Sequence, residues 1–378
     1  TSVGDLERIR KVATRIARAV TGGAKLAVTV SAMGHTTDRL VSMAREITPR
    51  PDRRELDMLM ATGEQQSVAL LALTLHDLGL RAESFTGPQA GFLTDSQSGN
   101  ARILEVNPAP LRRAFERVDV CLVAGFQGAD AAGMITTLGR GGSDTTAVAV
   151  AAALGASECE IYTDTEGVYT TDPHIVPEAR KLERVDYDEM LELASLGAQV
   201  LHPRSVWYAR RYGVRVHVRS SFSYNPGTFI ERLPQEARMK TDQPVTGVAL
   251  DLNHARVNVL GVPDVPGVAA RLFGALGAAG LSADMIIQGV PGDDSSRQQM
   301  SFTVNRDRAE EALEAIRPVL DELGGRAELD LEIAKLSVVG VAIGSTPGIA
   351  GRMFAAVSGT GANIEMITTS EVRISVVI

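Results

Sequence analysis

Two short segments hold the side chains best suited to chemistry, TTLGRGGSD at 136–144 and YTDTEGVYTTDP at 162–173. Each combines glycines, hydroxyls and an acidic residue at the end of an apolar run. Backbone N–H groups of such loops can face phosphate oxygens, above all where a helix begins. Together the two segments indicate phosphoryl transfer from a nucleotide to a small anionic substrate.

In the first segment, GRGGSD, the three glycines allow the backbone to approach an anion closely. Arg140 adds a planar guanidinium suited to a carboxylate or a phosphate. Ser143 and Asp144 lie where the next helix is predicted to begin, so a plain helix N-cap is the alternative interpretation of Ser143. A cap explains neither the glycines nor the arginine, which favours a binding loop for the whole string.

In the second segment, Thr163 and Asp164 follow the strand-like run ECEIYTD and are suited to a ribose or base. Tyr169 is suited to the face of an adenine ring. Residues 170–173 equally fit a simple turn closed by the proline. The density of hydroxyls and acids after a buried strand favours a binding site.

Glu64 comes one residue after Gly63, at the predicted start of a helix within ATGEQQS. A solvated first-turn glutamate is the alternative to a binding role there. His35 is predicted to be a loop residue rather than a catalytic base.

Apolar spacing predicts a helix over 3–20 followed by a strand over 25–34. The same pair recurs three times, at 66–80 with 82–86, at 109–117 with 119–125, and at 144–154 with 158–163. This alternation predicts an α/β fold with parallel strands and helices on both faces. Ligands bind beyond the carboxyl ends of such strands, where three loops are expected to converge: 31–38, 125–128 and 162–167.

The second half carries an internal repeat after a linker rich in Pro, Gly and charge. Residues 266–286 align without gaps to 347–367, with nine of 21 positions identical. Each copy follows a short apolar strand, 257–262 or 336–342, and begins its helix at Pro-Gly. One such unit cannot bury its own sheet, so the two copies are expected to pack as a pair. The pair is either a small-ligand sensor or a structural dimerisation module.

Composition limits the alternatives. A chain of 378 residues with 44% apolar residues and 22% charged residues predicts a soluble protein of two or three domains. A net charge of −8 without a basic cluster argues against nucleic acid as a partner. No apolar run is long enough to cross a membrane and no signal peptide is evident, so a cytoplasmic location is expected. Cys121 and Cys159 lie in apolar runs and are predicted to be buried, reduced thiols.

In order along the chain, SAMGHTTD, TGEQ, GFQG, TTLGRGGSD, YTDTEGVYTTDP, LGAQVLHPRS, VRSS and the two Pro-Gly repeats resemble the aspartate kinases of the amino-acid kinase family. The resemblance is to the bacterial form with tandem ACT domains. It implies a parallel-rich sheet sandwiched by helices over 1–230 and a linker over 231–243. Two intertwined ACT-like βαββαβ modules would follow over 244–378, spanning 257–330 and 331–378 plus strand 245–251.

The resemblance implies transfer of the γ-phosphoryl group of ATP to the side-chain carboxylate of L-aspartate. The product would be 4-phospho-L-aspartate, in the first step of lysine, threonine and methionine biosynthesis. A carboxylate with a pKa of about 4 is already ionised at neutral pH, so no general base is needed. Catalysis then consists of bringing two anions together and neutralising the charge on the transferred group.

The family motifs also imply roles for individual residues. Arg140 would bind the α-carboxylate of aspartate and Glu64 its α-ammonium group. The rest of the amino-acid pocket would comprise Thr37, Phe126, Gly141, Gly142, Ser143 and Asp144. ATP would contact Thr1, Ser2, Ser31, Thr163, Asp164, Tyr169, Thr170, Thr171, Asp172, Pro173, His174 and Gln199. Mg²⁺ would be held mainly by the phosphates, with no metal site of the protein's own.

Three departures from the family pattern concern the nucleotide. The opening motif Lys-Phe/Tyr-Gly-Gly-Thr/Ser-Ser is represented by its last two residues, Thr1 and Ser2. A polypeptide that began at Thr1 would lack the motif's lysine and is expected to catalyse little. Gln199 stands where many relatives have lysine, and His174 replaces a frequent arginine. Weaker nucleotide binding, or compensation by another charge, would follow.

The repeats would bind end-product amino acids. Threonine contacts would map to Asp264, Gly267, Ala269, Gln288, Asn363 and Ile364. A helix N-terminus after Pro-Gly can bind a carboxylate, and Asp264 can pair with an ammonium group. Lysine would bind near Asp284, Ser370 and Glu371, where Ala350 replaces a hydroxyl-bearing residue. Threonine is therefore the predicted inhibitor, and lysine is left open.

A homo-oligomer through the ACT domains is expected, and a separate regulatory chain is left open. Two other functions remain as alternatives. One is a kinase for another small acid such as glutamate, and the other is a non-catalytic amino-acid-binding regulator, suggested by Gln199 and the absent lysine.

Overall fold

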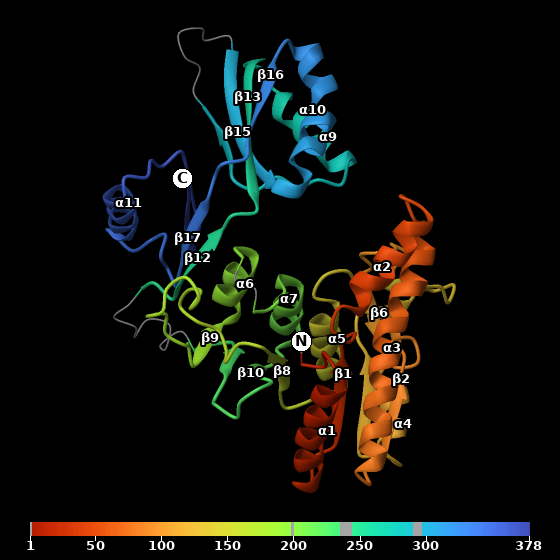
Figure 1. Cartoon of the computed structure of the whole chain (residues 1–378). Helices are drawn as coiled ribbons and strands as arrows, with labels where there is room; N and C mark the ends of the chain where they lie inside the picture. Colours follow the sequence, from red (N-terminus) through yellow and green to blue (C-terminus); the bar gives the residue numbers. More distant parts are fainter. Residues whose placement is uncertain (1, 198–199, 235–243, 290–296) are drawn as a thin grey trace. The chain divides into compact units, whose positions relative to one another are not determined.

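The computed structural model describes residues 2–197, 200–234, 244–289 and 297–378 (Figure 1). Thr1, Gln199 and most of the predicted linker lie outside the described residues, and Glu231 at its start ends strand β11. The chain forms two compact units, Thr1–Arg238 and Met239–Ile378, which are described separately.

The first unit contains a parallel sheet in the order β1-β5-β2, formed by β1 (Leu26–Val30), β5 (Val120–Ala124) and β2 (Ala82–Phe85). Alternate residues of β5 face opposite sides of this sheet, as the pleat of a strand requires. Val120 and Leu122 pack on α1 (Leu6–Thr21) and α3 (Arg53–Asp77). Cys121 and Val123 pack on α4 (Ala109–Ala114) and α5 (Gly142–Leu154). The predicted sandwich of helices around a parallel sheet is confirmed.

The remaining described strands of this unit form two more sheets. The sequence had predicted instead that three loops would converge at one edge of a single sheet. One sheet has the order β8-β10-β11-β9, with β8 (Cys159–Thr163), β10 (Val216–Ser220), β11 (Thr228–Glu231) and β9 (Arg184–Asp186). The other has the order β4-β3-β6-β7, with β4 (Ile103–Val106), β3 (Phe92–Thr94), β6 (Gln127–Ala129) and β7 (Ile135–Thr137). The first two predicted loops follow paired strands, because Val30 lies beside Ala124. The third follows β8, and α5 packs against both β1 and β8.

The described residues of the first unit also form the helices α2 (Thr36–Ile47), α6 (Tyr187–Ser195) and α7 (Pro203–Tyr212). Helix α7 packs against α5 and α6.

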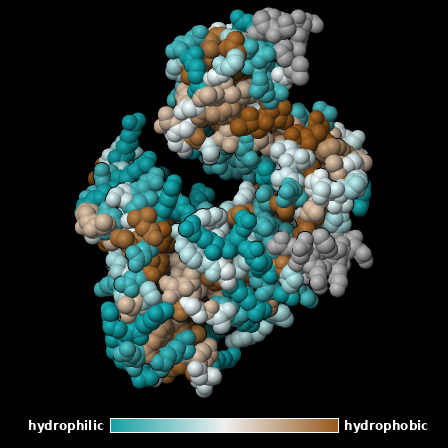
Figure 2. All heavy atoms as spheres, turned by 180° about the vertical axis from the view of Figure 1, so that it is seen from behind, coloured by the Kyte–Doolittle hydropathy of each residue, from teal (hydrophilic) through white to brown (hydrophobic). Residues whose placement is uncertain are grey.

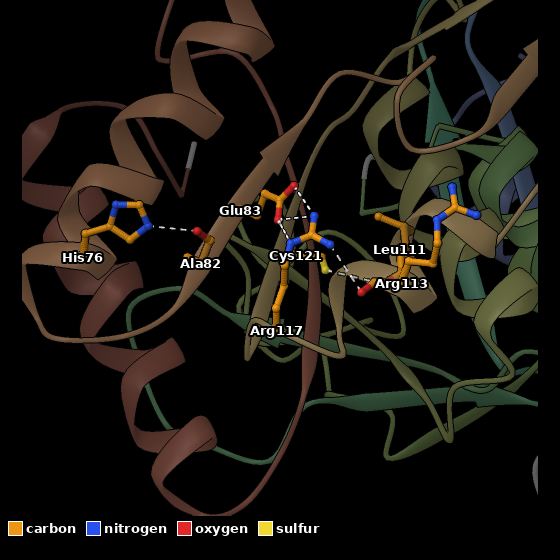
Figure 3. Close-up of polar contacts among 7 residues, drawn as sticks. All are labelled: His76, Ala82, Glu83, Leu111, Arg113, Arg117 and Cys121. Carbon is orange, nitrogen blue, oxygen red and sulfur yellow. Dashed lines mark hydrogen bonds and ion pairs between the residues drawn. The ribbon is translucent and has the colours of Figure 1, made fainter.

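Both cysteines are free and buried, as predicted. Figure 3 shows Cys121 on β5, where its thiol faces the Leu111 carbonyl, next to the ion pair of Arg117 with Glu83. Burial raises the pKa of Cys121 and of Cys159 to about 12. Both thiols are therefore protonated at neutral pH and serve as small packing residues.

The second unit holds the repeat as two modules. The first runs β13 (His254–Pro263), α9 (Val268–Ala278), β14 (Ile286–Gln288), β15 (Arg297–Asn305), the 3₁₀ turn Arg306–Arg308, α10 (Ala309–Leu323) and β16 (Arg326–Asp330). Its sheet has the order β14-β15-β13-β16, which is the predicted βαββαβ pattern.

The second module contains β17 (Lys335–Val339), α11 (Ile349–Gly359), β18 (Met366–Thr369) and β19 (Arg373–Val377). Strand β12 (Gly247–Asp251) precedes the first module in the chain, yet it pairs with β17 in the order β12-β17-β19-β18. Helices α9 and α11 begin after Gly267 and Gly348, whose φ angles of 99° and 87° favour glycine. The two copies of the repeat therefore begin their helices in the same way.

The two modules contact each other through apolar and charged residues. Met285 and Ile333 pack with Met366 and Val377 in one buried cluster. Beside it, Lys335 is only 1% exposed and forms an ion pair with Asp284. A buried ammonium group of this kind requires a fixed partner, so this pair ties the modules to one arrangement.

The molecular surface is mixed. Figure 2 shows hydrophobic residues as scattered patches among hydrophilic ones on the face it presents. Among the helices that the structure describes, none is both long and apolar enough to span a membrane.

Candidate active site

Glu64 lies in the middle of α3 and is 4% exposed. The predicted helix start at this position is therefore wrong, and so is the alternative interpretation of Glu64 as a solvated first-turn residue. Its Oε1 accepts a hydrogen bond of 3.2 Å from the Ala32 N–H in the loop after β1. Its Oε2 has no hydrogen-bond partner among the described residues. Burial raises the pKa of this carboxyl to about 7. Such a group gains a full charge when a cation approaches it.

Gly63 explains how the helix reaches this loop. A Cβ atom at position 63 would lie 3.0 Å from the Ala32 Cβ and 3.5 Å from the Thr36 methyl group. The glycine therefore marks close packing of α3 against the start of α2, rather than a helix end. Thr37 lies half-buried in the first turn of α2, and Ser31 is exposed at the end of β1.

The GRGGSD loop enters α5 through glycine. The N-cap of α5 is Gly141, with φ 66° and no side-chain cap. The alternative interpretation of Ser143 as the cap is therefore wrong, because the left-handed backbone already starts the helix two residues earlier. A Cβ atom at position 141 would lie 2.1 Å from the His202 Cβ, so only glycine fits. Arg140, just before it, is exposed and has no ion-pair partner among the described residues.

Asp144 lies in the first turn of α5. Burial raises the pKa of its carboxyl to about 6, although a hydrogen bond from the backbone N–H of His202 opposes the shift. His202, the N-cap of α7, accepts a hydrogen bond from the Arg204 N–H at 3.2 Å. Burial and the charges of Arg204 and Arg140 lower the pKa of the His202 imidazole. The loop is thus flanked by a neutral histidine.

Phe126 joins these loops. Its φ of 69° is unusual for a bulky residue and indicates local strain. Its N–H donates to Thr146 Oγ1 at 3.2 Å, and its carbonyl accepts from the Leu138 N–H at 2.8 Å. A Cβ atom at Gly142 would lie 2.8 Å from the Phe126 ring. The strained phenylalanine therefore packs directly under the helix start.

A continuous series of contacts connects Glu64 to the α5 loop. Glu64 bonds the N–H of Ala32, and the Val30 carbonyl accepts a hydrogen bond of 3.1 Å from the Gly125 N–H. A Cβ atom at position 125 would lie 2.7 Å from Ser143 Oγ. The predicted residues Thr37, Glu64, Phe126, Gly142, Ser143 and Asp144 thus gather around neighbouring loops. An exposed arginine and a buried carboxyl here are complementary to an amino acid's two charged groups.

Sequence reasoning missed two residues that support the loop. Asp57 of α3 is fully buried and accepts hydrogen bonds from Gly99 and Thr137. Arg204 of α7 donates to the Leu138 carbonyl and to Asn100 Oδ1. The string HPRS contained Arg204, but nothing local in the sequence pairs Asp57 with a residue eighty positions away.

Three of the predicted nucleotide residues, Ser2, Thr163 and Asp164, lie at the end of β8. Thr163 Oγ1 donates to Asp164 at 3.1 Å, and the Thr163 carbonyl accepts hydrogen bonds from the N–H and hydroxyl of Ser221. Ser2 donates to the Tyr162 carbonyl at 3.1 Å and also contacts the Ser221 hydroxyl. The beginning of the chain therefore lies beside this strand end, and Asp164 is exposed there.

Residues 169–174 form local turns. Tyr169 makes an isolated β-bridge with Lys181, and Thr170 Oγ1 accepts from the Arg180 N–H at 3.0 Å. Asp172 Oδ1 accepts from the His174 N–H at 2.8 Å. Thr171 and Pro173 are half-buried. The turn interpretation and the binding interpretation of this segment are compatible in this geometry.

One trio in the described part of the chain has metal-ligand spacing, Glu158, Glu160 and His217. Glu160 already accepts hydrogen bonds from Arg219 at 2.8 Å and from the Tyr162 hydroxyl at 2.7 Å. Burial and the charge of Arg219 lower the pKa of His217. A cation would have to displace the arginine, so we assign no ion to this trio.

Four of the six predicted effector residues lie in the first module. Asp264 and Gly267 are exposed between β13 and α9, and Ala269 is half-buried in the first turn of that helix. Gln288 on β14 donates to Gln298, whose amide in turn donates to the Pro263 carbonyl at 3.3 Å. Asn363 and Ile364 lie in the second module, before β18.

Comparison with known proteins agrees with this architecture. Residues 1–220 match the amino acid kinase family, and residues 257–319 and 336–378 match an ACT domain. A protein named aspartokinase from Thermus thermophilus is 63% identical over 378 residues, covering 100% of this chain and 92% of that protein. The aspartate kinase structure from Synechocystis has 45% identity and a TM-score of 0.57, covering 100% of this chain and 65% of that one.

Escherichia coli aspartokinase III, solved with lysine and aspartate, has 25% identity and a TM-score of 0.73, covering 100% of this chain and 94% of its own. Solved with aspartate and ADP it gives a TM-score of 0.80 at 24% identity, with the same coverage, which supports the fold alone. Together with the family matches and the site geometry, these similarities show that this chain belongs to the amino acid kinase family, as a member of its aspartokinase branch.

Proposed function

We propose that this chain transfers the γ-phosphoryl group of ATP to the side-chain carboxylate of L-aspartate, giving 4-phospho-L-aspartate and ADP. The observation that carries the proposal is Glu64, a buried carboxyl with one oxygen lacking a hydrogen-bond partner among the described residues. Contacts through Ala32, Gly125 and Ser143 connect it to the loop of Arg140. Glu64 binds the α-ammonium group of aspartate, and Arg140 binds its α-carboxylate.

The reacting carboxylate enters as an anion, so proton removal is unnecessary. The protein's contribution is to hold two anions in contact and to offset their repulsion. Thr37, Phe126, Gly141, Gly142, Ser143 and Asp144 complete the amino-acid pocket. The backbone N–H groups at the start of α5 face the charge that develops during transfer.

ATP binds with Mg²⁺ at the end of β8, as a co-substrate whose phosphates hold most of the metal's coordination sites. Thr163 and Asp164 contact the ribose or base, Tyr169 lies against the face of the adenine ring, and Ser31 also contacts ATP. Thr1, Ser2, Thr170, Thr171, Asp172, Pro173, His174 and Gln199 complete the nucleotide site. Ser2 supports this proposal, because it contacts both Tyr162 and Ser221 beside that strand end.

The second unit acts as a feedback sensor for threonine. Asp264, Gly267, Ala269 and Gln288 occupy one end of the first module, next to a helix N-terminus suited to a carboxylate. Asn363 and Ile364 lie on the second module, so the proposed threonine contacts are divided between the two modules. Asp284, the residue to which lysine binding would map, already pairs with Lys335. That pairing favours threonine and leaves lysine open.

The domain boundaries follow the same proposal: a kinase domain over 1–230, a linker over 231–243 and ACT modules over 244–378. Homo-oligomers form through the ACT modules. Ile286 and Ile367 support this, because they occupy equivalent repeat positions on edge strands β14 and β18 and are 53% and 44% exposed. The protein acts in the cytoplasm at the start of lysine, threonine and methionine biosynthesis, alone or with a separate regulatory chain.

The test is acyl-phosphate formation by the full-length gene product, trapped as a hydroxamate, with Mg-ATP and either L-aspartate or L-glutamate. Turnover with aspartate, suppressed by threonine, supports both units' roles. Turnover with glutamate alone would assign another acid as substrate. Tight threonine binding without turnover on either acid would leave the non-catalytic regulator as the function.

A further inference from the structure

The carboxylate of Asp57 is fully buried and has no part in the chemistry proposed above. It lies on α3 seven residues before Glu64. Seven residues are about two helical turns, or roughly 10 Å along the axis, so the two side chains leave the same face of the helix. Helix α3 therefore carries both the residue that binds the substrate ammonium group and this second carboxylate.

Asp57 uses both of its oxygens on segments remote in sequence. Oδ1 accepts a hydrogen bond of 2.6 Å from the Thr137 hydroxyl. Oδ2 accepts one of 3.1 Å from the Thr137 N–H and one of 2.9 Å from the Gly99 N–H. Thr137 is the last residue of β7, three residues before Arg140. The buried carboxylate thus holds the base of the arginine loop.

Arg204 also holds this loop through hydrogen bonds. Its guanidinium group donates to the Leu138 carbonyl, to the Ala101 carbonyl at 3.5 Å and to Asn100 Oδ1 at 2.6 Å. The 99–100 turn then packs on Gly139, where a Cβ atom would lie 3.1 Å from the Gly99 carbonyl oxygen. The backbone next to Arg140 is therefore held between Asp57 and Arg204.

We propose that Asp57 is a positioning residue for amino-acid binding, which fixes the loop of Arg140 to the helix of Glu64. The inference rests on the proposed function, because it takes those two side chains as the partners of the substrate's charged groups. Its consequence is selective. The nucleotide residues at the end of β8 are held instead by Ser2 and Ser221, so changes at Asp57 weaken aspartate binding and leave ATP binding intact.

The sharpest variants are Thr137→Val and its matched control Thr137→Ser. Valine is nearly isosteric with threonine and removes only the hydroxyl that bonds Oδ1, whereas serine keeps it. Asp57→Asn is the stronger change, because it removes the negative charge that all three hydrogen bonds share and its amide nitrogen can face only the Thr137 hydroxyl, which must then act as the acceptor. We expect Thr137→Val to raise the aspartate KM by about tenfold and Asp57→Asn by tenfold or more. Thr137→Ser should restore the wild-type value.

Two further readouts separate positioning from a general loss of structure. The ATP KM should stay within about twofold of wild type in every variant. Adding Thr137→Val to Asp57→Asn should raise the aspartate KM little beyond Asp57→Asn alone, because both remove the same contact. Aspartate affinity is measured in parallel by calorimetry on full-length protein, and thermal unfolding reports folding.

The outcomes are distinguishable. A wild-type protein that neither binds nor phosphorylates aspartate contradicts the proposed function and removes the basis of this inference. An active wild type whose Thr137→Val variant keeps the normal aspartate KM overturns the role of Asp57 alone. Equal increases in the KM of aspartate and ATP, with lowered thermal stability, would also overturn it. If Asp57→Asn fails to fold, the two Thr137 variants decide.

Discussion

The loop that carries Arg140 and the nucleotide segment 164–174 both follow a strand, but different parts of the chain hold them. Leu138 and Thr137 bond residues 66 and 80 positions away. Thr170 and Asp172 bond residues ten and two positions away. The geometry of the amino-acid side is therefore a tertiary property. In the nucleotide segment, Glu166 and Val168 also bond residues 59 and 60 positions away, but residues 170–174 are held by local turns. Substitutions should accordingly affect binding more on the amino-acid side.

The largest effect is expected at Arg140. Arg140→Ala removes the exposed guanidinium group proposed to bind the α-carboxylate and should lower kcat/KM for aspartate by about 100-fold or more. Arg140→Lys keeps the positive charge but loses the planar guanidinium group. Its kcat/KM should therefore lie between those of the wild type and the alanine variant. The measurement is hydroxamate-trapped product against aspartate concentration. An unchanged kcat/KM in the alanine variant would refute this role for Arg140.

The two ends of α5 provide a matched pair of glycines. Gly141 and Gly155 have φ angles of 66° and 68°. A Cβ atom at 141 would collide with His202, whereas one at 155 meets nothing within 4 Å. Gly155→Ala should cost only backbone strain of roughly 1 kcal/mol and leave activity intact. Gly141→Ala should also lose most activity with aspartate. Equal kinetic effects at both ends would show that the start of α5 has no special place in the site.

Glu64 links substrate binding to pH. Its carboxyl has a pKa of about 7, and the substrate ammonium group binds the ionised form. Aspartate KM should therefore fall as pH rises from 6 to 8, and Glu64→Gln should raise KM about tenfold or more and flatten that dependence. Asp144, with a pKa of about 6, titrates in both proteins and serves as the internal control. A pH profile that survives the substitution would assign the titration elsewhere.

The same residue should affect stability in the opposite direction. The pKa of the Glu64 carboxyl in the folded protein lies above its ordinary value of 4.5. The contribution of this group to the free energy of unfolding is therefore fully present below pH 4.5 and is lost as pH rises through about 7. Above pH 7 the wild type should be less stable than Glu64→Gln by on the order of 3 kcal/mol. Denaturant unfolding at pH 5 and pH 8 measures this difference. If Glu64→Gln were less stable than the wild type at pH 8, the wild type would not contain a buried carboxylate whose charge destabilises the fold.

The smallest effect is expected in the local turns. Asp172→Ala removes the hydrogen bond to the His174 N–H, which contributes about 1 kcal/mol. We expect the ATP KM to rise only a few-fold and the aspartate KM to stay unchanged. Steady-state kinetics with each substrate varied in turn checks this. A larger effect on aspartate than on ATP would break the distinction between the two sides.

The contrast between local and tertiary contacts also explains which features the sequence could predict. Pro-Gly before each repeat helix correctly predicted the starts of α9 and α11, because a helix start depends on a few neighbouring residues. Gly63 suggested a helix start before Glu64, but the glycine is required there because α3 packs closely against Ala32. Asp57 gave no signal at all, since its partners lie 42 and 80 residues away. The sequence could therefore predict which residue types form the candidate site, but not the buried residues that hold them in place.

Strand β12 has a consequence for how the chain can be divided. It lies before the first module yet forms one edge of the second module's sheet, so the first module is an insertion within the second. A fragment that began after Asp251 would expose the backbone of β17 as a new edge and invite aggregation. A fragment that began at Met239 would keep both sheets whole. Any shorter translation product or protease fragment that folds as an autonomous sensor must therefore include residues 247–251.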